Sequence, residues 1–246
     1  MNTTAKPITS AAWLCCFAVA AALSSGCGMV ANGRNVDGVR YFQQGQYGVA
    51  VQRFQAALAA DRTNADAYYN LAATYHRVGV QNKDSASLAS AESLYRQALD
   101  INPNHVDGRR GLAVLLTETN RTDEAFGMLR QWVATNPTLA DARVELARLH
   151  EEYGDKKTAE TQLAESLQIN PNNWRAHAAL GRLREQSGDY AQALANYQRA
   201  YQINQFQPQL AERIASLQRQ ATNIYATPAP YGGTTTATNP RPDMRY

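Results

Sequence analysis

The sequence predicts an all-α protein, built as a solenoid of five helix-turn-helix repeats and a final helix. The first observation behind this prediction is a proline that returns every 34 residues, at Pro103, Pro137 and Pro171, each time directly after an asparagine. The second is that small and large residues recur at fixed offsets when the chain is aligned on this period. A period of 34 residues is the length of one helix-turn-helix unit.

The recurring offsets have a physical reason in helix packing. With the proline numbered as position 32, small residues occupy positions 8 and 20, where two antiparallel helices must approach closely: Ala72, Ala113, Ala147 and Gly181 at 8, and Ala91, Ala125, Ala159 and Ala193 at 20. Larger residues at positions 7 and 24 fill the space between neighbouring helices. The Asn-Pro pair ends the second helix, because proline disfavours helix at the residue before it.

This pattern resembles the tetratricopeptide repeat (TPR) over residues 31–207. The resemblance implies a right-handed α-solenoid in which the first helix of each repeat lines a concave groove. The offsets divide the chain into five repeats: 31–64, 65–105, 106–139, 140–173 and 174–207.

The second repeat carries seven extra residues between Gly79 and Ala91. Seven residues are nearly two helical turns, so a longer second helix would keep its apolar face in register, with Asp84 or Ser85 as the N-cap. A loop insertion is the alternative. In the third repeat, Trp132 stands at a usually small position and Gly127 lies in the same helix, which indicates altered packing there.

A last amphipathic helix is predicted at 208–222. Pro208 suits a first helical turn, and Leu210, Ile214 and Leu217 recur at helical spacing, so the helix would cap the apolar end of the array. Residues 223–246 are rich in proline and threonine and are expected to be disordered. They could be an inert tail, a short recognition peptide or a spacer that spans the cell wall.

The N-terminal segment 1–26 has the form of a secretory signal. Lys6 precedes an apolar stretch at 11–23, which is shorter than the roughly 20 residues of a membrane-spanning helix. The segment resembles a bacterial lipoprotein signal, in which Cys27 would become the lipid-bearing first residue. Ser24 departs from that pattern, since leucine is usual three residues before the cysteine. An ordinary cleaved signal with an incidental cysteine is the alternative.

The same resemblance predicts where the protein resides. In lipoproteins of double-membraned bacteria, an aspartate directly after the lipid-bearing cysteine marks retention at the inner membrane. Gly28 stands at that position here, so an anchor in the outer membrane is favoured. A soluble periplasmic or secreted protein is the alternative. The other two cysteines, Cys15 and Cys16, lie inside the signal, which leaves the repeats free of cysteine and suits an exported protein without disulfides.

No motif in the chain predicts catalysis. The four histidines include no pair three or four residues apart, so none forms a helical metal site. The sequence also has no glycine-rich phosphate loop and no Gly-x-Ser-x-Gly nucleophile motif. Its 24 basic and 21 acidic residues are too nearly balanced for a nucleic-acid footprint. We therefore predict no enzymatic activity, no cofactor, no metal and no nucleic-acid partner.

The predicted partner is a protein or peptide in the groove. In the TPR family, positions 2, 5, 9, 12 and 13 of each first helix point into it, and arginine and aromatic side chains dominate binding hot spots. The candidate groove residues are Tyr69, His76, Arg77, Arg110, Arg148 and Arg182. Alternatively, Arg148 and Arg182 pair with Glu145, Glu151 or Glu185 on a solvated face.

The clamp by which chaperone-binding TPR proteins grip a C-terminal carboxylate is not expected here. Of its five positions only Asn70 matches, and the others hold Asn35, Val39, Asp107 and Gly111.

The sequence thus favours a non-enzymatic adaptor or scaffold in the bacterial cell envelope. By fold-level analogy, such a protein could assemble an envelope complex such as a pilus or secretin. A self-assembling structural envelope protein and an accessory subunit of a cell-wall enzyme are the alternatives.

Overall fold

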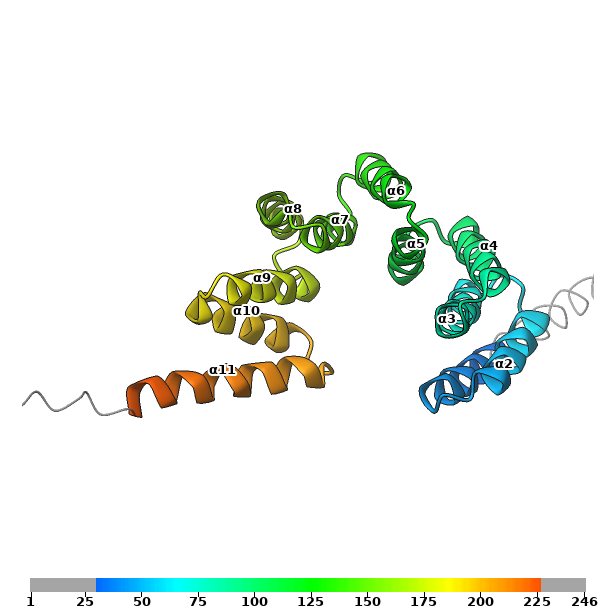
Figure 1. Cartoon of the computed structure of the whole chain (residues 1–246), viewed down its shortest axis with the longest axis horizontal. Coiled ribbons are helices and arrows are strands. Elements are labelled where there is room, and N and C mark those ends of the chain that lie inside the picture. Colours follow the sequence, from blue (N-terminus) through cyan, green and yellow to red (C-terminus); the bar gives the residue numbers. More distant parts are fainter. Residues whose placement is uncertain (1–29, 227–246) are drawn as a thin grey trace, which may run out of the picture. The chain divides into compact units, whose positions relative to one another are not determined.

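The structure is a computed structural model that describes residues 30–226, with side chains to residue 220, and its regular elements in this range are all helical (Figure 1). The chain forms two compact units that divide between Asn170 and Pro171. The predicted signal at 1–26, Cys27 and most of the predicted tail at 223–246 lie outside the described residues.

Both units are series of antiparallel helix pairs, which confirms the predicted all-α repeat fold. The first unit contains a helix over residues 30–43 and then α2 (Tyr47–Ala60), α3 (Ala65–Asn82), α4 (Ser85–Ile101), α5 (Val106–Glu118), α6 (Thr122–Thr135), α7 (Ala140–Glu152) and α8 (Lys156–Ile169). The second contains α9 (Trp174–Gln186), α10 (Tyr190–Ile203) and α11 (Pro208–Ala226). Helices α3, α5, α7 and α9 begin at the first residue of the predicted repeats two to five.

The Asn-Pro pairs end helices as predicted. Helices α4, α6 and α8 each stop directly before the pair, and the asparagine caps the helix with φ of −127°, −130° and −136°. These φ values are typical of extended backbone, which a residue before proline prefers. Each asparagine N–H still donates to the carbonyl oxygen four residues earlier, so the helix ends without an abrupt loss of hydrogen bonding.

A left-handed residue at position 15 turns the chain between the two helices of a repeat. Gly45, Gly154 and Gly188 have φ of 73°, 83° and 82°, and Asn120 takes the same place at 61°. Glycine adopts this conformation at no steric cost and asparagine tolerates it, which accounts for the residue types found there. In the extended second repeat, Lys83 has φ of 55° in the corresponding turn.

The seven extra residues of the second repeat lengthen helices and form no loop. Helix α3 has 18 residues and α4 has 17, whereas α5 and α6 of the third repeat have 13 and 14. Asp84 is the N-cap of α4, as predicted. Its carboxylate accepts hydrogen bonds from the backbone N–H groups of Ala86 and Ser87. The prediction placed the whole extension in the second helix; in the structure both helices share it, since α3 continues past Gly79 to Asn82.

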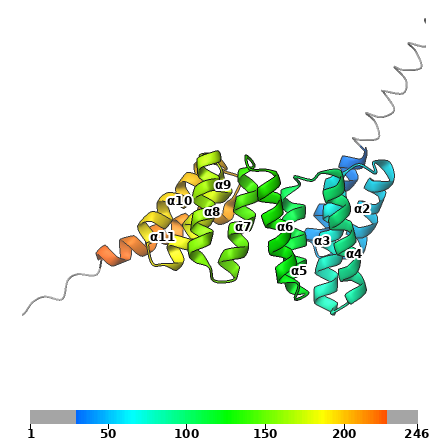
Figure 2. The same cartoon turned by 90° about the horizontal axis from the view of Figure 1, so that it is seen from above.

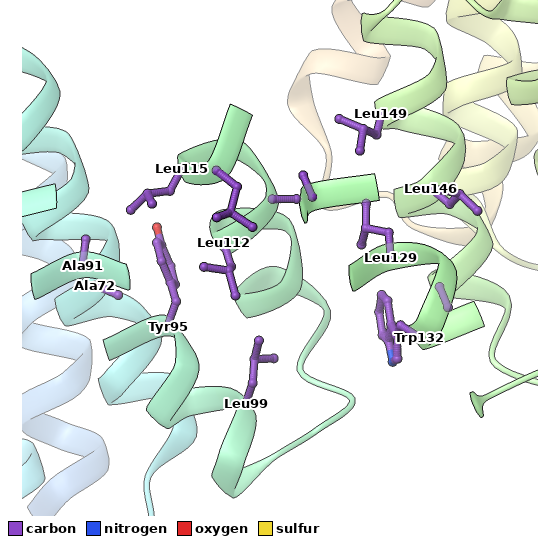
Figure 3. Packing of buried hydrophobic residues seen from close by; sticks show 14 residues of the cluster. Ala72, Ala91, Tyr95, Leu99, Leu112, Leu115, Leu129, Trp132, Leu146 and Leu149 are labelled. Atoms are coloured by element: carbon purple, nitrogen blue, oxygen red, sulfur yellow. The ribbon is translucent and has the colours of Figure 1, made fainter. Parts of the chain in front are cut away.

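The core of the first unit runs through the small positions predicted from the period (Figure 3). Ala72 and Ala91 lie beside the ring of Tyr95, and the cluster continues to the buried Trp132. The indole Nε1 donates to Asn104 Oδ1 at 2.9 Å, and the Arg109 guanidinium lies 5.2 Å from the ring centroid. Trp132 therefore fills a usually small position and has a partner for its N–H group.

In the second unit, α11 covers α10 as the predicted cap. Leu210 and Leu217 are buried against Ala193, Tyr197 and Ala200. The helix continues to Ala226, four residues beyond the predicted end at 222. No further glycine or proline occurs before Pro228 to stop it.

Two glycines in helix interiors should respond to alanine in opposite ways. A Cβ at Gly111 in α5 would lie 2.5 Å from Cε1 of the buried Tyr95 ring, whereas a Cβ at Gly127 in α6 would meet nothing within 4 Å. We expect Gly111→Ala to lower the free energy of unfolding by about 1–2 kcal/mol through overpacking. Gly127→Ala should raise it by about 0.5–1 kcal/mol, because alanine favours the helix.

Denaturant unfolding of the two variants beside the wild type measures this difference. Equal effects of the two substitutions would contradict the close contact between Gly111 and Tyr95.

Candidate functional site

The first helices of the repeats form one face of the first unit. Helix α3 contacts α5, and α5 contacts α7. In Figure 1 these three lie on the inner side of the unit and α4, α6 and α8 on the outer side; Figure 2 shows the same helices running side by side. We call the surface of the 30–43 helix, α3, α5 and α7 the inner face.

Hydrogen bonds between polar side chains join neighbouring first helices across the inner face. Asn70 Nδ2 donates to Asn35 Oδ1 at 3.0 Å, which links α3 to the 30–43 helix. His105 Nε2 lies 2.9 Å from Asp66 Oδ1. His105 Nδ1 accepts from the backbone N–H of Gly108 as the N-cap of α5, so Nε2 must carry the proton that is donated to Asp66.

A second set of contacts fixes the aromatic side chains near the middle of α3. The ring of Tyr69 lies 6.1 Å from that of Tyr95 and 5.3 Å from that of His105. His76 joins Tyr95 to the next repeat, with Nδ1 3.4 Å from the Tyr95 hydroxyl and Nε2 2.7 Å from Glu118 Oε2. Burial, with the neighbouring Tyr69 hydroxyl and the Glu118 carboxylate, raises the pKa of the Tyr95 hydroxyl, which stays protonated at neutral pH.

A buried carboxylate, Glu145, holds two of the candidate arginines. Arg110 of α5 donates to both oxygens of Glu145, with Nε 2.9 Å from Oε2, and a third nitrogen donates to Asp107 at 3.0 Å. Arg148 of α7 approaches Glu145 at 3.4 Å. Burial alone would lower the pKa of Arg110, but the hydrogen bonds and charge of Glu145 raise it overall. Arg148 therefore pairs with Glu145, as in the alternative prediction. The pair does not lie on a solvated face, however, because Glu145 is only 1 % exposed.

A pocket of about 210 Å³ opens on the inner face beside these contacts. Its walls come from the 30–43 helix, α3, α4 and α5: Phe42, Ala73, His76, Arg77, Val80, Tyr95 and Glu118. The walls present more apolar than polar surface, and their polar groups belong to His76, Arg77, Tyr95 and Glu118. His76 and Tyr95 are held in place by the hydrogen bonds described above.

The structure separates the six candidate groove residues into three groups. His76 and Arg77 line the pocket. Tyr69, Arg110 and Arg148 make contacts between helices of the first unit. Arg182 belongs to the second unit, where it lines a polar pocket of about 440 Å³ with Glu185, Gln186, Tyr190, Arg213 and Gln220.

In that polar pocket, Glu185 is the central acceptor. It accepts from the Tyr197 hydroxyl at 3.0 Å and from Arg213 Nε at 2.8 Å. Burial and the hydrogen bond to Glu185 raise the pKa of Tyr197 to about 12. These contacts tie the capping helix α11 to α9 and α10, which indicates a structural role for the group.

The candidate set does not contain five of the lining residues: Phe42, Ala73, Val80, Tyr95 and Glu118. Ala73 and Glu118 stand at positions 9 and 13 of their repeats, which the TPR resemblance directs into the groove. Phe42 could have been found in the same way, because it occupies position 12 of the first repeat, as His76 does in the second. Val80 and Tyr95 do not occupy any of the five repeat positions that point into the groove in the TPR family. Tyr95 reaches the inner face from α4 because Gly111 leaves room for its ring.

No group of three or more His, Cys, Asp and Glu side chains is placed to hold a metal ion in the described part of the chain. Among its helices, none combines the length and apolar character that crossing a membrane requires.

Comparison with known families agrees with the helix pairs. Models described as tetratricopeptide repeat match residues 84–138, 121–183 and 175–207, and a model described as TPR repeat matches 38–79. The chain belongs to the tetratricopeptide repeat family. As a TPR protein it has the general function of a scaffold for protein–protein interaction. A search of curated proteins gave no significant match.

Several solved TPR structures are similar to this TPR protein. A thermophilic TPR protein of Thermus thermophilus, TTC0263, superposes with a TM-score of 0.57 at 22% identity, over 77% of this chain and 99% of that one, and supports the fold. PilF of Pseudomonas aeruginosa gives a TM-score of 0.49 at 19% identity, over 81% and 94%. YrrB, described as a TPR protein with an unusual peptide-binding site, gives 0.39 at 18% identity, over 77% and 90%.

Proposed function

We propose that this TPR protein is a non-enzymatic adaptor of the bacterial cell envelope that holds a peptide or a partner helix against the inner face of its first unit. The pocket between Phe42 and Glu118 carries the proposal. It is hollow and mostly apolar with a few fixed polar groups, which is the usual character of a binding site. Its walls come from three successive first helices, so one bound segment would contact three repeats.

The state of the lining side chains supports binding over simple packing. Val80 is 45 % exposed and Arg77 is also exposed, so the rim presents both an apolar and a charged group to a partner. His76 and Tyr95 at the base are fixed by hydrogen bonds. A site whose polar groups are already oriented loses less side-chain freedom on binding, which favours affinity.

The envelope part of the proposal rests on the N-terminal sequence. Cys27, after a signal-like segment at 1–26, would carry the lipid and anchor the chain in a membrane, and Gly28 favours the outer membrane. An anchored adaptor of this kind would serve the assembly of an envelope complex, such as a pilus or a secretin.

Purification of the tagged full chain from membrane fractions tests both parts. We expect a partner to co-purify with the wild type and to be reduced at least about tenfold by Val80→Lys, which places a positive charge on the apolar rim. Ile169→Lys on α8 is the matched control, because Ile169 is similarly exposed, at 37 %, on an outer helix. Cys27→Ser should move the chain and its partner to the soluble fraction.

Two results would contradict the proposal. A partner that Val80→Lys retains would bind elsewhere than in the pocket. A Cys27→Ser chain that stays with the membrane would rule out the lipid anchor at that residue.

A further inference from the structure

We propose that the pocket on the inner face binds a cationic peptide segment, with one large apolar side chain inside the pocket and an adjacent lysine or arginine paired with Glu118. This inference rests on the proposed adaptor function and names the chemistry of its partner. The size of the pocket, the charge of α3, α5 and α7 and the geometry of Glu118 carry it.

The size of the pocket fits a single side chain. An apolar cavity of about 150 Å³ accommodates a benzene ring, and sites for drug-sized ligands are about 300–1,000 Å³. At about 210 Å³, the pocket lies between these values. Phe42, Ala73 and Val80 supply an apolar lining, which suits a phenylalanine, leucine or methionine side chain better than a polar one.

The exposed charge on α3, α5 and α7 is mostly negative, although the whole chain has a net charge of +3. Four carboxylates on α3, α5 and α7 have side chains that are 43–75 % exposed: Asp66, Asp107, Glu118 and Glu152. On the same three helices, Arg77 is the arginine with an exposed side chain. Arg110 and Arg148 are 34 % and 27 % exposed and are held by Glu145. A negative surface attracts a positively charged segment and disfavours an acidic one.

Glu118 places a negative charge where the bound segment would leave the pocket. Its side chain is 46 % exposed, and its Oε2 accepts from His76 at 2.7 Å. His76 is in turn held by the Tyr95 hydroxyl, so the carboxylate has a fixed position. A cation beside the apolar anchor can form a charge-assisted hydrogen bond there, which is stronger than a neutral one.

Fluorescence anisotropy with the full chain in mild detergent tests the proposal with three labelled peptides. The first is a short peptide with one phenylalanine between two pairs of lysines. The second has alanine for the phenylalanine, and the third has glutamates for the lysines. We expect the first to bind most tightly, and each of the others at least about tenfold more weakly.

Two pocket variants and one control locate the binding. Ala73→Phe should abolish binding of the lysine–phenylalanine peptide by filling the pocket, and Glu118→Gln should weaken it about threefold to tenfold. Asp100→Asn, which removes an exposed carboxylate on α4, should leave the affinity unchanged. Circular dichroism confirms that each variant is folded, and Glu118→Gln remains informative if Ala73→Phe is not.

The proposal is wrong if the glutamate or alanine peptide binds as tightly as the first, if no peptide binds, or if neither pocket variant changes the affinity. The adaptor function remains supported after any of these results if the co-purified partner is still lost with Val80→Lys. Loss of both the peptide binding and the Val80-dependent partner would remove the adaptor function as well.

Discussion

Trp132→Ala is expected to lower the free energy of unfolding of the first unit by about 3–5 kcal/mol. The indole is 1 % exposed and is the largest fully buried side chain among the described residues. Alanine would leave a cavity beside Leu129 and Leu146 (Figure 3), and it would remove the hydrogen bond to Asn104 and the contact with Arg109. Guanidinium unfolding followed by circular dichroism measures the loss.

Trp132→Phe separates packing from hydrogen bonding at this position. Phenylalanine keeps an aromatic ring in the core but has no N–H to donate to Asn104, so we expect a smaller loss of about 1–2 kcal/mol. If Trp132→Ala lowers the free energy of unfolding by less than about 1 kcal/mol, the stability of the third repeat does not depend on the indole, and neighbouring side chains fill its space.

Arg110→Ala should lower the free energy of unfolding by about 3 kcal/mol, although the residue was a candidate for partner binding. Glu145 is 1 % exposed, and Arg110 donates to both of its carboxylate oxygens. Without Arg110, the buried charge keeps only Arg148, at 3.4 Å. Removing one member of a buried ion pair costs about 3–5 kcal/mol, and the remaining arginine offsets part of it. Urea unfolding of the variant measures the change.

Two controls distinguish a buried charge from an ordinary ion pair. Arg121 also bonds two carboxylates, Glu92 and Glu124, but its side chain is 40 % exposed, so Arg121→Ala should cost less than about 1 kcal/mol. The double variant Arg110→Met/Glu145→Leu removes both charges and should recover most of the lost stability. If Arg110→Ala and Arg121→Ala lower the free energy of unfolding equally, the burial of Glu145 is not the cause of the destabilisation.

The sequence was sufficient for the fold because its signals are local and repeated. The Asn-Pro pairs mark the ends of helices, and a glycine or asparagine with left-handed backbone conformation marks the turn between the two helices of a repeat. Asp84 could be named as a cap because capping depends on residues two and three positions away. The sequence did not reveal that α3 and α4 share the insertion. Gly79 is the last residue before the insertion, and no local signal shows whether α3 ends there or continues.

The site was predicted less well because its contacts are long-range. An offset within the repeat tells which face a residue occupies, but the neighbours of Arg110 and His76 lie 35 and 42 residues away. Whether a groove arginine is available to a partner depends on those neighbours. Tyr95 lines the pocket from a second helix because a glycine in the next repeat admits its ring, which no offset within one repeat reveals.

The most direct test of the inner-face binding site is photo-cross-linking in cells from two positions. A photoreactive amino acid replaces Arg77 at the rim of the pocket in one strain and Asp123, an exposed residue of the outer helix α6, in another. We expect a cross-linked partner from position 77 and none from position 123. A partner cross-linked from position 123 and not from position 77 would contradict it, because the interaction would then lie on the outer helices.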